Sequence, residues 1–279
     1  MILMTGEELS KNINLELKQQ VKGYMIKPCL AVIQVGENRI SKLHAEKKLK
    51  ISDEIGVYLK YICFPEDTKE IEIVNKIVEL NNDDYVNGIV LELPLPDKYN
   101  QEKLINYIAR NKDVAGLTDL NLGKIFNNKK CYVPHVAQAV VALCQQNKID
   151  LIGKHAVIVN RSSLIGKPLA GLLLNNDATV TICHLQTNNL KEIINSADIL
   201  ISAIGVPNII SGSSIKNDTV VFDLGVSFSD DKFSSDINTK ELSSNVFYID
   251  LLNSYFEEVS IAFLLKNTIE SYQKMNEEK

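Results

Sequence analysis

The amino-acid sequence predicts an α/β protein with two lobes, each built on a parallel sheet that carries helices on its faces. Short apolar segments alternate with longer amphipathic segments, which is the pattern of strands connected by helices. One polar stretch, residues 111–128, interrupts the alternation and separates two runs. The chain has 279 residues, a length that suits two domains of ordinary size.

The first run predicts four helices and three strands. Thr5 can cap the first helix, and Glu7 and Glu8 in its first turn favour the positive end of the helix dipole. Pro94 and Pro96 force the chain out of the third strand, because proline cannot continue a central strand. We expect residues 111–128 to form a polar loop. The predicted helices are Thr5–Lys22, Ser41–Ile55, Thr68–Leu80 and Gln101–Ala109, and the strands are Cys29–Val35, Val57–Phe64 and Gly88–Leu93.

The second run repeats the alternation. A helix over Val136–Asn147 links it to the first, and a closing helix runs from Phe256 to Tyr272. Between them, Gly205 and Gly225 follow the ends of two buried strands. We predict strands over Ala156–Val159, Ala178–Cys183, Asp198–Ile204, Thr219–Leu224 and Tyr248–Ile249, and helices over Ile165–Asn175 and Leu190–Ser196.

The stretch Ala156–Pro168 has the features of a phosphate-binding corner. A buried strand leads into the polar turn Asn160-Arg161-Ser162-Ser163, and Gly166 then opens an apolar helix. The start of such a helix offers unpaired N–H groups and a positive dipole end to a pyrophosphate. The usual G-x-G-x-x-G is absent, so an ordinary strand-to-helix turn is the alternative. A Walker A loop is excluded, because Pro168 stands where serine or threonine is needed.

The charges near this corner favour NADP over NAD. An NAD site usually shows an acidic residue at the end of the second strand, whereas Thr181–Asn189 contains none. Arg161 and His184 follow the ends of the first and second predicted strands of this lobe. A cation at such a position attracts the additional 2′-phosphate of NADP.

The composition excludes several classes of protein. A net charge of −5 does not indicate a nucleic-acid surface, and no apolar run approaches the ~20 residues of a membrane helix. The N-terminus lacks the pattern of a signal peptide. The five cysteines are scattered and form no CxxC, so we expect reduced thiols in a cytoplasmic protein without a metal site.

Six segments together resemble the bifunctional methylenetetrahydrofolate dehydrogenase/methenyltetrahydrofolate cyclohydrolase family, of FolD type. The resemblance implies a folate-type domain at 1–135, completed by a C-terminal helix at 256–279 that packs back on it, and a Rossmann-like NADP-binding domain at 136–255. It also implies a homodimer, and a hydride transfer followed by hydrolysis of the methenyl product. The segments are VGENRISKLHAEKKLKISDEIG (Val35–Gly56), GIVLELPLP (Gly88–Pro96), NKDVAGLTDLNLGKI (Asn111–Ile125), VNRSSLIGKPLAGLLLNNDATVTICH (Val159–His184), ADILISAIGVP (Ala197–Pro207) and VVFDLGVS (Val220–Ser227).

The resemblance assigns roles to individual residues. The family's catalytic lysine falls on Lys48, with His44 four residues earlier on the same helix face and Glu92 as the modulating group. The implied substrate-binding positions are Asp113, Ala115 and Ser260. The implied cofactor-binding positions are Asn160, Arg161, Ser162, Gly166, Leu185, Gly205 and Val226.

Several of these residues depart from the family pattern. His44 replaces a tyrosine, Glu92 a glutamine, and Ala115 an aspartate that resembles a pterin anchor. A carboxylate within about 4–6 Å of Lys48 favours the charged ammonium and disfavours base chemistry near neutral pH. A charged His44 opposes this effect. Asn160 replaces a glycine and Leu185 a serine that contacts the cofactor phosphate in the family.

The glycine- and proline-rich loop of the family falls on Leu251–Ser260, where none of those residues remains. Tyr255, Phe256 and two glutamates stand there instead, so this segment cannot bring bare backbone against a ligand. Two hypotheses follow. The chain is a working folate enzyme with an atypical pocket, or it is a diverged, impaired or substrate-switched paralogue that acts as a binding or regulatory protein.

Overall fold

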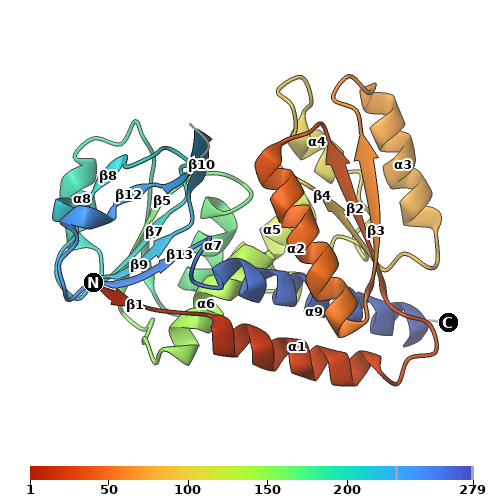
Figure 1. The fold of residues 1–279 in the computed structure, drawn as a ribbon, viewed down its shortest axis with the longest axis horizontal. Coiled ribbons are helices and arrows are strands. Elements are labelled where there is room, and N and C mark those ends of the chain that lie inside the picture. Colours follow the sequence, from red (N-terminus) through yellow and green to blue (C-terminus); the bar gives the residue numbers. More distant parts are fainter. Residues whose placement is uncertain (230–231, 278–279) are drawn as a thin grey trace. The chain divides into compact units, whose positions relative to one another are not determined.

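Residues 1–229 and 232–277 of the computed structural model are described here, and they form two units (Figure 1). The small-sheet unit comprises Ser10–Lys124, Lys130–His135 and Ile261–Lys279. The large-sheet unit comprises Met1–Leu9, Ile125–Lys129 and Val136–Ser260.

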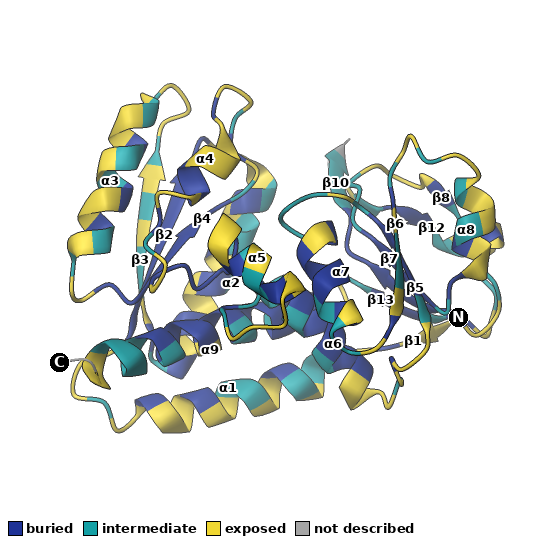
Figure 2. Ribbon diagram, turned by 180° about the vertical axis from the view of Figure 1, so that it is seen from behind, coloured by how far each residue is buried: buried dark blue, intermediate teal, exposed yellow. Residues whose placement is uncertain are grey.

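The small-sheet unit is built on three parallel strands in the order β3-β2-β4. The central strand β2 (Cys29–Val35) is buried along its whole length, because β3 (Tyr58–Phe64) and β4 (Gly88–Leu91) flank it. Figure 2 shows β2 and β4 as buried and β3 as the partly exposed edge. Its helices are α2 (Arg39–Ile55), α3 (Glu70–Asn82) and α4 (Gln101–Ile105), together with most of α1 (Glu7–Val21).

Helix α2 is fixed at both ends by capping. The Asn38 side chain accepts hydrogen bonds from the backbone N–H groups of Ile40 (2.9 Å) and Ser41 (3.1 Å). Gly56 ends the helix in the left-handed conformation (φ 98°), which glycine adopts without strain. The cap explains why the helix begins two residues before the predicted Ser41, and it sets which face of α2 carries Lys48.

The C-terminal helix α9 (Phe256–Glu277) fastens two loops of the small-sheet unit. The buried Asn267 side chain donates hydrogen bonds to the carbonyl oxygens of Val114 (2.8 Å) and Val133 (3.2 Å). Ser271 donates to the carbonyl oxygen of Asn111 (2.7 Å). The prediction that this helix packs back on the first lobe is therefore confirmed. Its last two predicted residues, 278 and 279, lie outside the described residues.

The large-sheet unit contains a parallel sheet in the order β1-β13-β9-β7-β5-β6, as the Rossmann-like prediction requires. Strands β7 and β9 at its centre are buried along their whole length. Its helices are α6 (His135–Gln146), which precedes β5, α7 (Gly166–Leu174), which joins β5 to β6, and α8 (Leu190–Ser196), which joins β6 to β7. The strands are β1 (Ile2–Leu3), β5 (His155–Val159), β6 (Thr179–Cys183), β7 (Ile199–Ser202), β9 (Val220–Asp223) and β13 (Phe247–Asp250).

Short strands and single 3₁₀ turns lie between β7 and β13 in the chain. A parallel pair joins β8 (Ile210–Ser211) to β12 (Ile237–Asn238), and an antiparallel pair joins β10 (Val226–Ser229) to β11 (Lys232–Ser235). Single 3₁₀ turns occur at Gly212–Ser214 and Thr239–Glu241. None of these elements was predicted.

The prediction of a loop over residues 111–128 is wrong in its second half. Asp119–Phe126 forms helix α5, with Asp119 in its first turn. Leu122 and Ile125 lie three residues apart and turn inward, a helical spacing that the surrounding polar residues and Gly123 obscure in the sequence. Among the described residues, no helix is long and apolar enough to cross a membrane.

Replacing Asn267 by alanine should lower the free energy of unfolding by about 2–4 kcal/mol, because it leaves two buried carbonyl groups without their donor. Urea unfolding followed by circular dichroism measures the change. The neighbouring Lys266→Ala is the matched control, since Lys266 is exposed and should stay within about 0.5 kcal/mol of wild type. Equal stabilities of the two variants would contradict the role given to Asn267.

Candidate active site

A buried ion pair lies where strand β4 of the small-sheet unit ends. Lys48 on α2 and Glu92, directly after β4, have side chains that are only 7% and 6% exposed. The Lys48 Nζ atom is 2.9 Å from each Glu92 carboxylate oxygen. Two of the three predicted catalytic residues therefore meet, and the lysine faces a carboxylate at contact distance rather than a neutral amide.

The arrangement has a definite chemical meaning. Two charges removed from water are tolerated only as a close, hydrogen-bonded pair. The Lys48 Nζ atom and the Glu92 carboxylate form such a pair. The site therefore places an amine in contact with a carboxylate, and both are groups that transfer protons in enzymes.

A third titratable group, His135 at the start of α6, belongs to the same cluster. Its Nδ1 atom is buried and has no hydrogen-bond partner among the described residues. Burial, and then the charges of Lys48 and His44, lower the pKa of His135 from the usual 6.5 to about 3. His135 is therefore neutral near pH 7, and its imidazole lies close enough to Lys48 and His44 to sense their charges.

His135 was not among the predicted site residues. The sequence offered one signal, a histidine directly after Pro134 and ahead of an apolar helix, within a segment that aligns with a family motif. His44, which was predicted, is half-buried on α2 one turn before Lys48.

The predicted substrate-binding residues of the small-sheet unit have different environments. Asp113 is fully buried and accepts hydrogen bonds from the N–H groups of Leu117 (3.1 Å) and Thr118 (2.8 Å) and from the Asn121 side chain (2.7 Å). Its oxygens therefore hold the loop that leads into α5. Ala115 is 3% exposed and places only a methyl group beside that loop.

Ser260, the third predicted substrate-binding residue, lies on α9 at the end of the large-sheet unit and is 4% exposed. The first turn of α9 replaces the glycine- and proline-rich loop of the family. Phe256, which is fully buried, packs edge-to-face on Phe222 with ring centroids 6.4 Å apart. This segment has become part of the core.

In the large-sheet unit, Asn160 organises the turn between β5 and α7. Its Oδ1 atom accepts hydrogen bonds from the backbone N–H groups of Ser162 (2.8 Å) and Gly166 (3.0 Å) and from the Ser162 hydroxyl (2.7 Å). Its Nδ2 atom donates to the carbonyl oxygen of Ala203, after β7. A methyl group at Gly166 would lie 2.1 Å from the Asn160 carbonyl oxygen, so only glycine fits.

The expectation of free N–H groups at the start of α7 is wrong. Gly166 donates to Asn160, Lys167 donates to the carbonyl oxygen of Ser162 (3.0 Å), and Pro168 has no N–H. The asparagine side chain therefore takes donors that a glycine in its place would leave available to a phosphate. The exposed Arg161 remains as a side chain that can meet an anion at this edge, because the Ser162 hydroxyl already donates to Asn160.

Asp236 fixes the loop after β7, where two more predicted cofactor residues lie. Its carboxylate accepts hydrogen bonds from the N–H groups of Ile204 (2.6 Å), Gly205 (2.8 Å) and Val206 (3.0 Å). Gly205 has φ 78°, and a methyl group there would be 3.4 Å from the Val226 carbonyl oxygen, so the predicted residues 205 and 226 adjoin each other. Leu185, which follows β6, is 52% exposed.

The residues of this edge fit a dinucleotide. An exposed cation at Arg161 and a rigid turn at Gly205 lie at the carboxyl ends of the neighbouring parallel strands β5 and β7. Sequence reasoning missed Asp236, which lies 31 residues after Gly205, a separation that leaves no local pattern.

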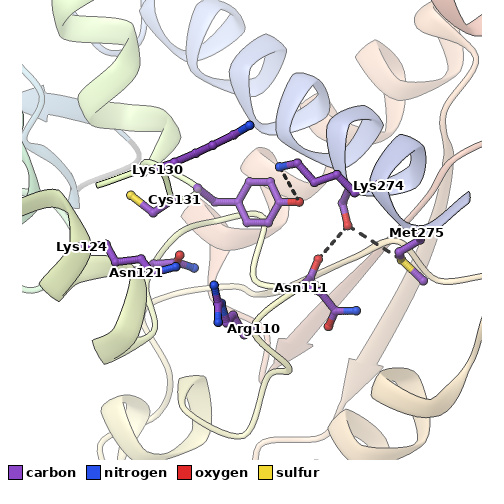
Figure 3. Close-up of a pocket in the computed structure, with 10 residues that line it drawn as sticks. Arg110, Asn111, Asn121, Lys124, Lys130, Cys131, Lys274 and Met275 are labelled. Carbon is purple, nitrogen blue, oxygen red and sulfur yellow. Dashed lines mark hydrogen bonds between the residues drawn. The ribbon is translucent and has the colours of Figure 1, made fainter. Parts of the chain in front are cut away.

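A separate pocket of about 680 Å³ opens beside the last turns of α9, within the small-sheet unit (Figure 3). Lys274 Nζ lies 3.4 Å from the Tyr132 hydroxyl and 4.5 Å from the centre of its ring. The pocket shares no lining residue with the Lys48 cluster, so its size alone does not make it the catalytic site. Its lining residues are Arg110, Asn111, Asn121, Lys124, Lys130, Cys131, Tyr132, Ser271, Lys274 and Met275.

Replacing Lys48 by methionine should lower the free energy of unfolding by about 3–5 kcal/mol, because Glu92 is left as an unpaired buried charge. The double variant Lys48→Met/Glu92→Leu should recover much of that loss. Lys103→Ala, which breaks the exposed pair of Lys103 with Glu70, is the control and should change stability little. A double variant less stable than the single one would contradict the buried-pair account.

The stability of the protein should fall as the pH is lowered from 6.5 towards 3, with a contribution from His135. The unfolded chain binds this proton near pH 6.5 and the folded chain only near 3, so acid favours unfolding in that window. In His135→Ala the slope should be shallower by up to about 1.4 kcal/mol per pH unit. His155→Ala serves as the control, and a slope unchanged in His135→Ala would refute the assignment.

Both parts of the chain match models of one family. Residues 4–115 match the tetrahydrofolate dehydrogenase/cyclohydrolase catalytic domain, and residues 134–276 match the NAD(P)-binding domain of the same family. The bifunctional protein FolD of Clostridium novyi is 38% identical over 273 residues, covering 96% of this chain and 98% of that protein.

Solved structures agree with these matches. The bifunctional enzyme FolD from Campylobacter jejuni, a methylenetetrahydrofolate dehydrogenase/cyclohydrolase, is 34% identical with a TM-score of 0.91, covering 98% of this chain and 99% of that one. The Trypanosoma brucei methylenetetrahydrofolate dehydrogenase-cyclohydrolase, complexed with NADP cofactor and inhibitor, is 26% identical with a TM-score of 0.92 and 98% coverage of both chains. This chain therefore belongs to the tetrahydrofolate dehydrogenase/cyclohydrolase family.

Proposed function

We propose that this protein oxidises methylenetetrahydrofolate to methenyltetrahydrofolate with NADP and hydrolyses the product to formyltetrahydrofolate, as an enzyme of one-carbon metabolism. The observation that carries the proposal is the buried contact of Lys48 with Glu92 at the end of β4, in a chain whose two parts match the two domains of this family. A lysine kept in a buried cluster of titratable groups is the feature expected of a proton-transfer site.

Lys48, His44 and Glu92 are the proposed catalytic residues. NADP, when bound, accepts the hydride that leaves the methylene carbon of the substrate. For hydrolysis, a water molecule must lose a proton as its oxygen bonds to the methenyl carbon. Lys48 is the residue proposed to accept that proton, and Glu92 holds its Nζ atom at 2.9 Å. His44 lies one turn earlier on the same helix.

The proposed cofactor residues are Asn160, Arg161, Ser162, Gly166, Leu185, Gly205 and Val226, at one edge of the large sheet. NADP is favoured by the absence of an acidic residue between Thr181 and Asn189, by the exposed Arg161, and by the NADP complex of the Trypanosoma brucei relative. Leu185 offers no polar group, so the cationic Arg161 is left as the principal contact for a 2′-phosphate.

The proposal extends to the organisation of the protein. The folate chemistry belongs to residues 1–135 and the C-terminal helix, with Asp113, Ala115 and Ser260 at the substrate, and the cofactor to residues 136–255. We infer a homodimer by resemblance to the family. We place the protein in the cytoplasm, which agrees with five cysteines that are all free thiols.

The first experiment measures both reactions on purified protein. Absorbance follows methenyltetrahydrofolate formation with NADP and with NAD, and separately follows the decay of added methenyltetrahydrofolate. Lys48→Ala should lower both rates by about a hundredfold or more. Glu92→Gln should raise the rate of hydrolysis near neutral pH, because Lys48 then contacts a neutral amide in place of a carboxylate 2.9 Å away, and a neighbouring carboxylate disfavours a lysine base.

The outcomes separate the two hypotheses. Turnover that depends on Lys48 supports the enzyme. Folded wild-type protein with neither activity, at any pH tested, would sink the proposal and leave the diverged binding protein. A rate of hydrolysis that Glu92→Gln does not change would remove Glu92 from the mechanism while leaving the activity itself in place.

A further inference from the structure

Four positively charged side chains line the pocket beside α9, and the described residues that line it include no acidic residue (Figure 3). All of the lining residues belong to the small-sheet unit. The net charge of the chain is −5, so the pocket gathers charge of the opposite sign to that of the whole protein. The cations come from four segments: Arg110 follows α4, Lys124 lies on α5, Lys130 precedes α6, and Lys274 lies on α9.

Little within the protein neutralises these charges. Arg110, Lys124 and Lys130 form no ion pair with a carboxylate of residues 1–229 and 232–277. Lys274 Nζ is 3.9 Å from a carboxylate oxygen of Glu270, but the two side chains are 44% and 43% exposed, and such exposed pairs are weak. The pocket therefore offers positive charge to an anion from solution.

Buried polar side chains hold the walls of the pocket together. Ser271 is 1% exposed and donates to the carbonyl oxygen of Asn111 (2.7 Å), which joins α9 to the loop after α4. Asn121 is 2% exposed and donates to Asp113 (2.7 Å), an acid near Cys131 whose oxygens already accept three hydrogen bonds. These contacts form the cavity before a ligand arrives, which lowers the cost of binding.

The charge and the size of the pocket indicate the class of molecule that fits it. A phosphate ester carries nearly two negative charges at neutral pH, whereas a carboxylate carries one. Lysine ammonium groups and the arginine fork both bind phosphate. A volume of about 680 Å³ is that of a small-molecule site and exceeds what inorganic phosphate fills. The Met275 thioether adds apolar surface for an organic part.

We propose that this pocket is a binding site for a small phosphorylated organic molecule, whose phosphate is held by Arg110, Lys124, Lys130 and Lys274. The site is separate from those of the proposed function. It shares no lining residue with the Lys48 cluster, and the proposed cofactor residues belong to the large-sheet unit.

Protection of Cys131 from alkylation tests the proposal at the pocket itself. Cys131 lines the pocket and is half-buried, whereas Cys63 is exposed in the same unit and does not line it. Mass spectrometry of the peptides gives both iodoacetamide rates in one sample. The probes are ribose 5-phosphate, fructose 1,6-bisphosphate and AMP. At saturation, at least one should slow the alkylation of Cys131 about fivefold or more, because a bound phosphate covers the thiol and disfavours its thiolate. The rate at Cys63 should not change.

Two double variants test the role of the cations. Lys124→Gln/Lys130→Gln should raise the probe concentration that gives half-maximal protection about tenfold, because two charge-assisted contacts are lost. Lys18→Gln/Lys22→Gln, two exposed lysines at the end of α1, is the matched control and should keep the wild-type value. All four lysines are at least partly exposed, so circular dichroism should show folded protein for both variants.

The outcomes do not depend on whether the protein turns over folate. Protection that Lys124→Gln/Lys130→Gln weakens and the control pair keeps supports the site. Absence of protection with every probe, or equal protection in both variants, would overturn it. Citrate, a tricarboxylate, is compared at the same concentrations, and protection equal to that of the phosphates would contradict the phosphate assignment. Protection of Cys131 by tetrahydrofolate would place the pocket in the folate site and refute a separate one.

Discussion

In a parallel sheet every strand ends at the same edge, and this constraint decides where polar groups can gather in both units of the protein. Glu92 follows β4, the Asn160 turn follows β5, and Gly205 follows β7. The strands β2, β4, β7 and β9 are buried along their whole length, so polar groups that act on a ligand gather where these strands stop. A helix that crosses such an edge then brings its side chains to the same place, as α2 does with Lys48.

The atypical residues of the folate-type site make sense as a group rather than one at a time. The buried carboxylate of Glu92 is stabilised by its ion pair with Lys48. Burial, and then the charges of Lys48 and His44, lower the pKa of His135 to about 3 and keep it neutral near pH 7. Glu92 and Lys48 therefore depend on each other, and the charge of Lys48 acts in turn on His135.

Much of the fold could be predicted from the sequence, because it rests on local patterns. The strand Cys29–Val35 and the helix Leu190–Ser196 were predicted to the residue. Helix α5 was missed because polar residues and Gly123 hide its spacing, and β1 was missed because two residues make no pattern without their partner β13. The resemblance led to the prediction that Lys48 and Glu92 interact. His135 and Asp236 were missed, because the groups with which they interact lie far away in the sequence. The expectation of unpaired N–H groups at the start of α7 was wrong. The local sequence does not show that the Asn160 side chain accepts hydrogen bonds from the backbone of its own turn.

The self-contained turn at Asn160 has a consequence for how the protein holds an anion. Its side-chain oxygen already occupies the place among the backbone donors that a phosphate oxygen takes in glycine-rich turns. The cofactor contact proposed for Arg161 relies on an exposed positive charge, which dissolved ions screen over a Debye length of about 8 Å at physiological ionic strength. Under the proposed function, cofactor affinity in this protein therefore depends on the salt content of its surroundings.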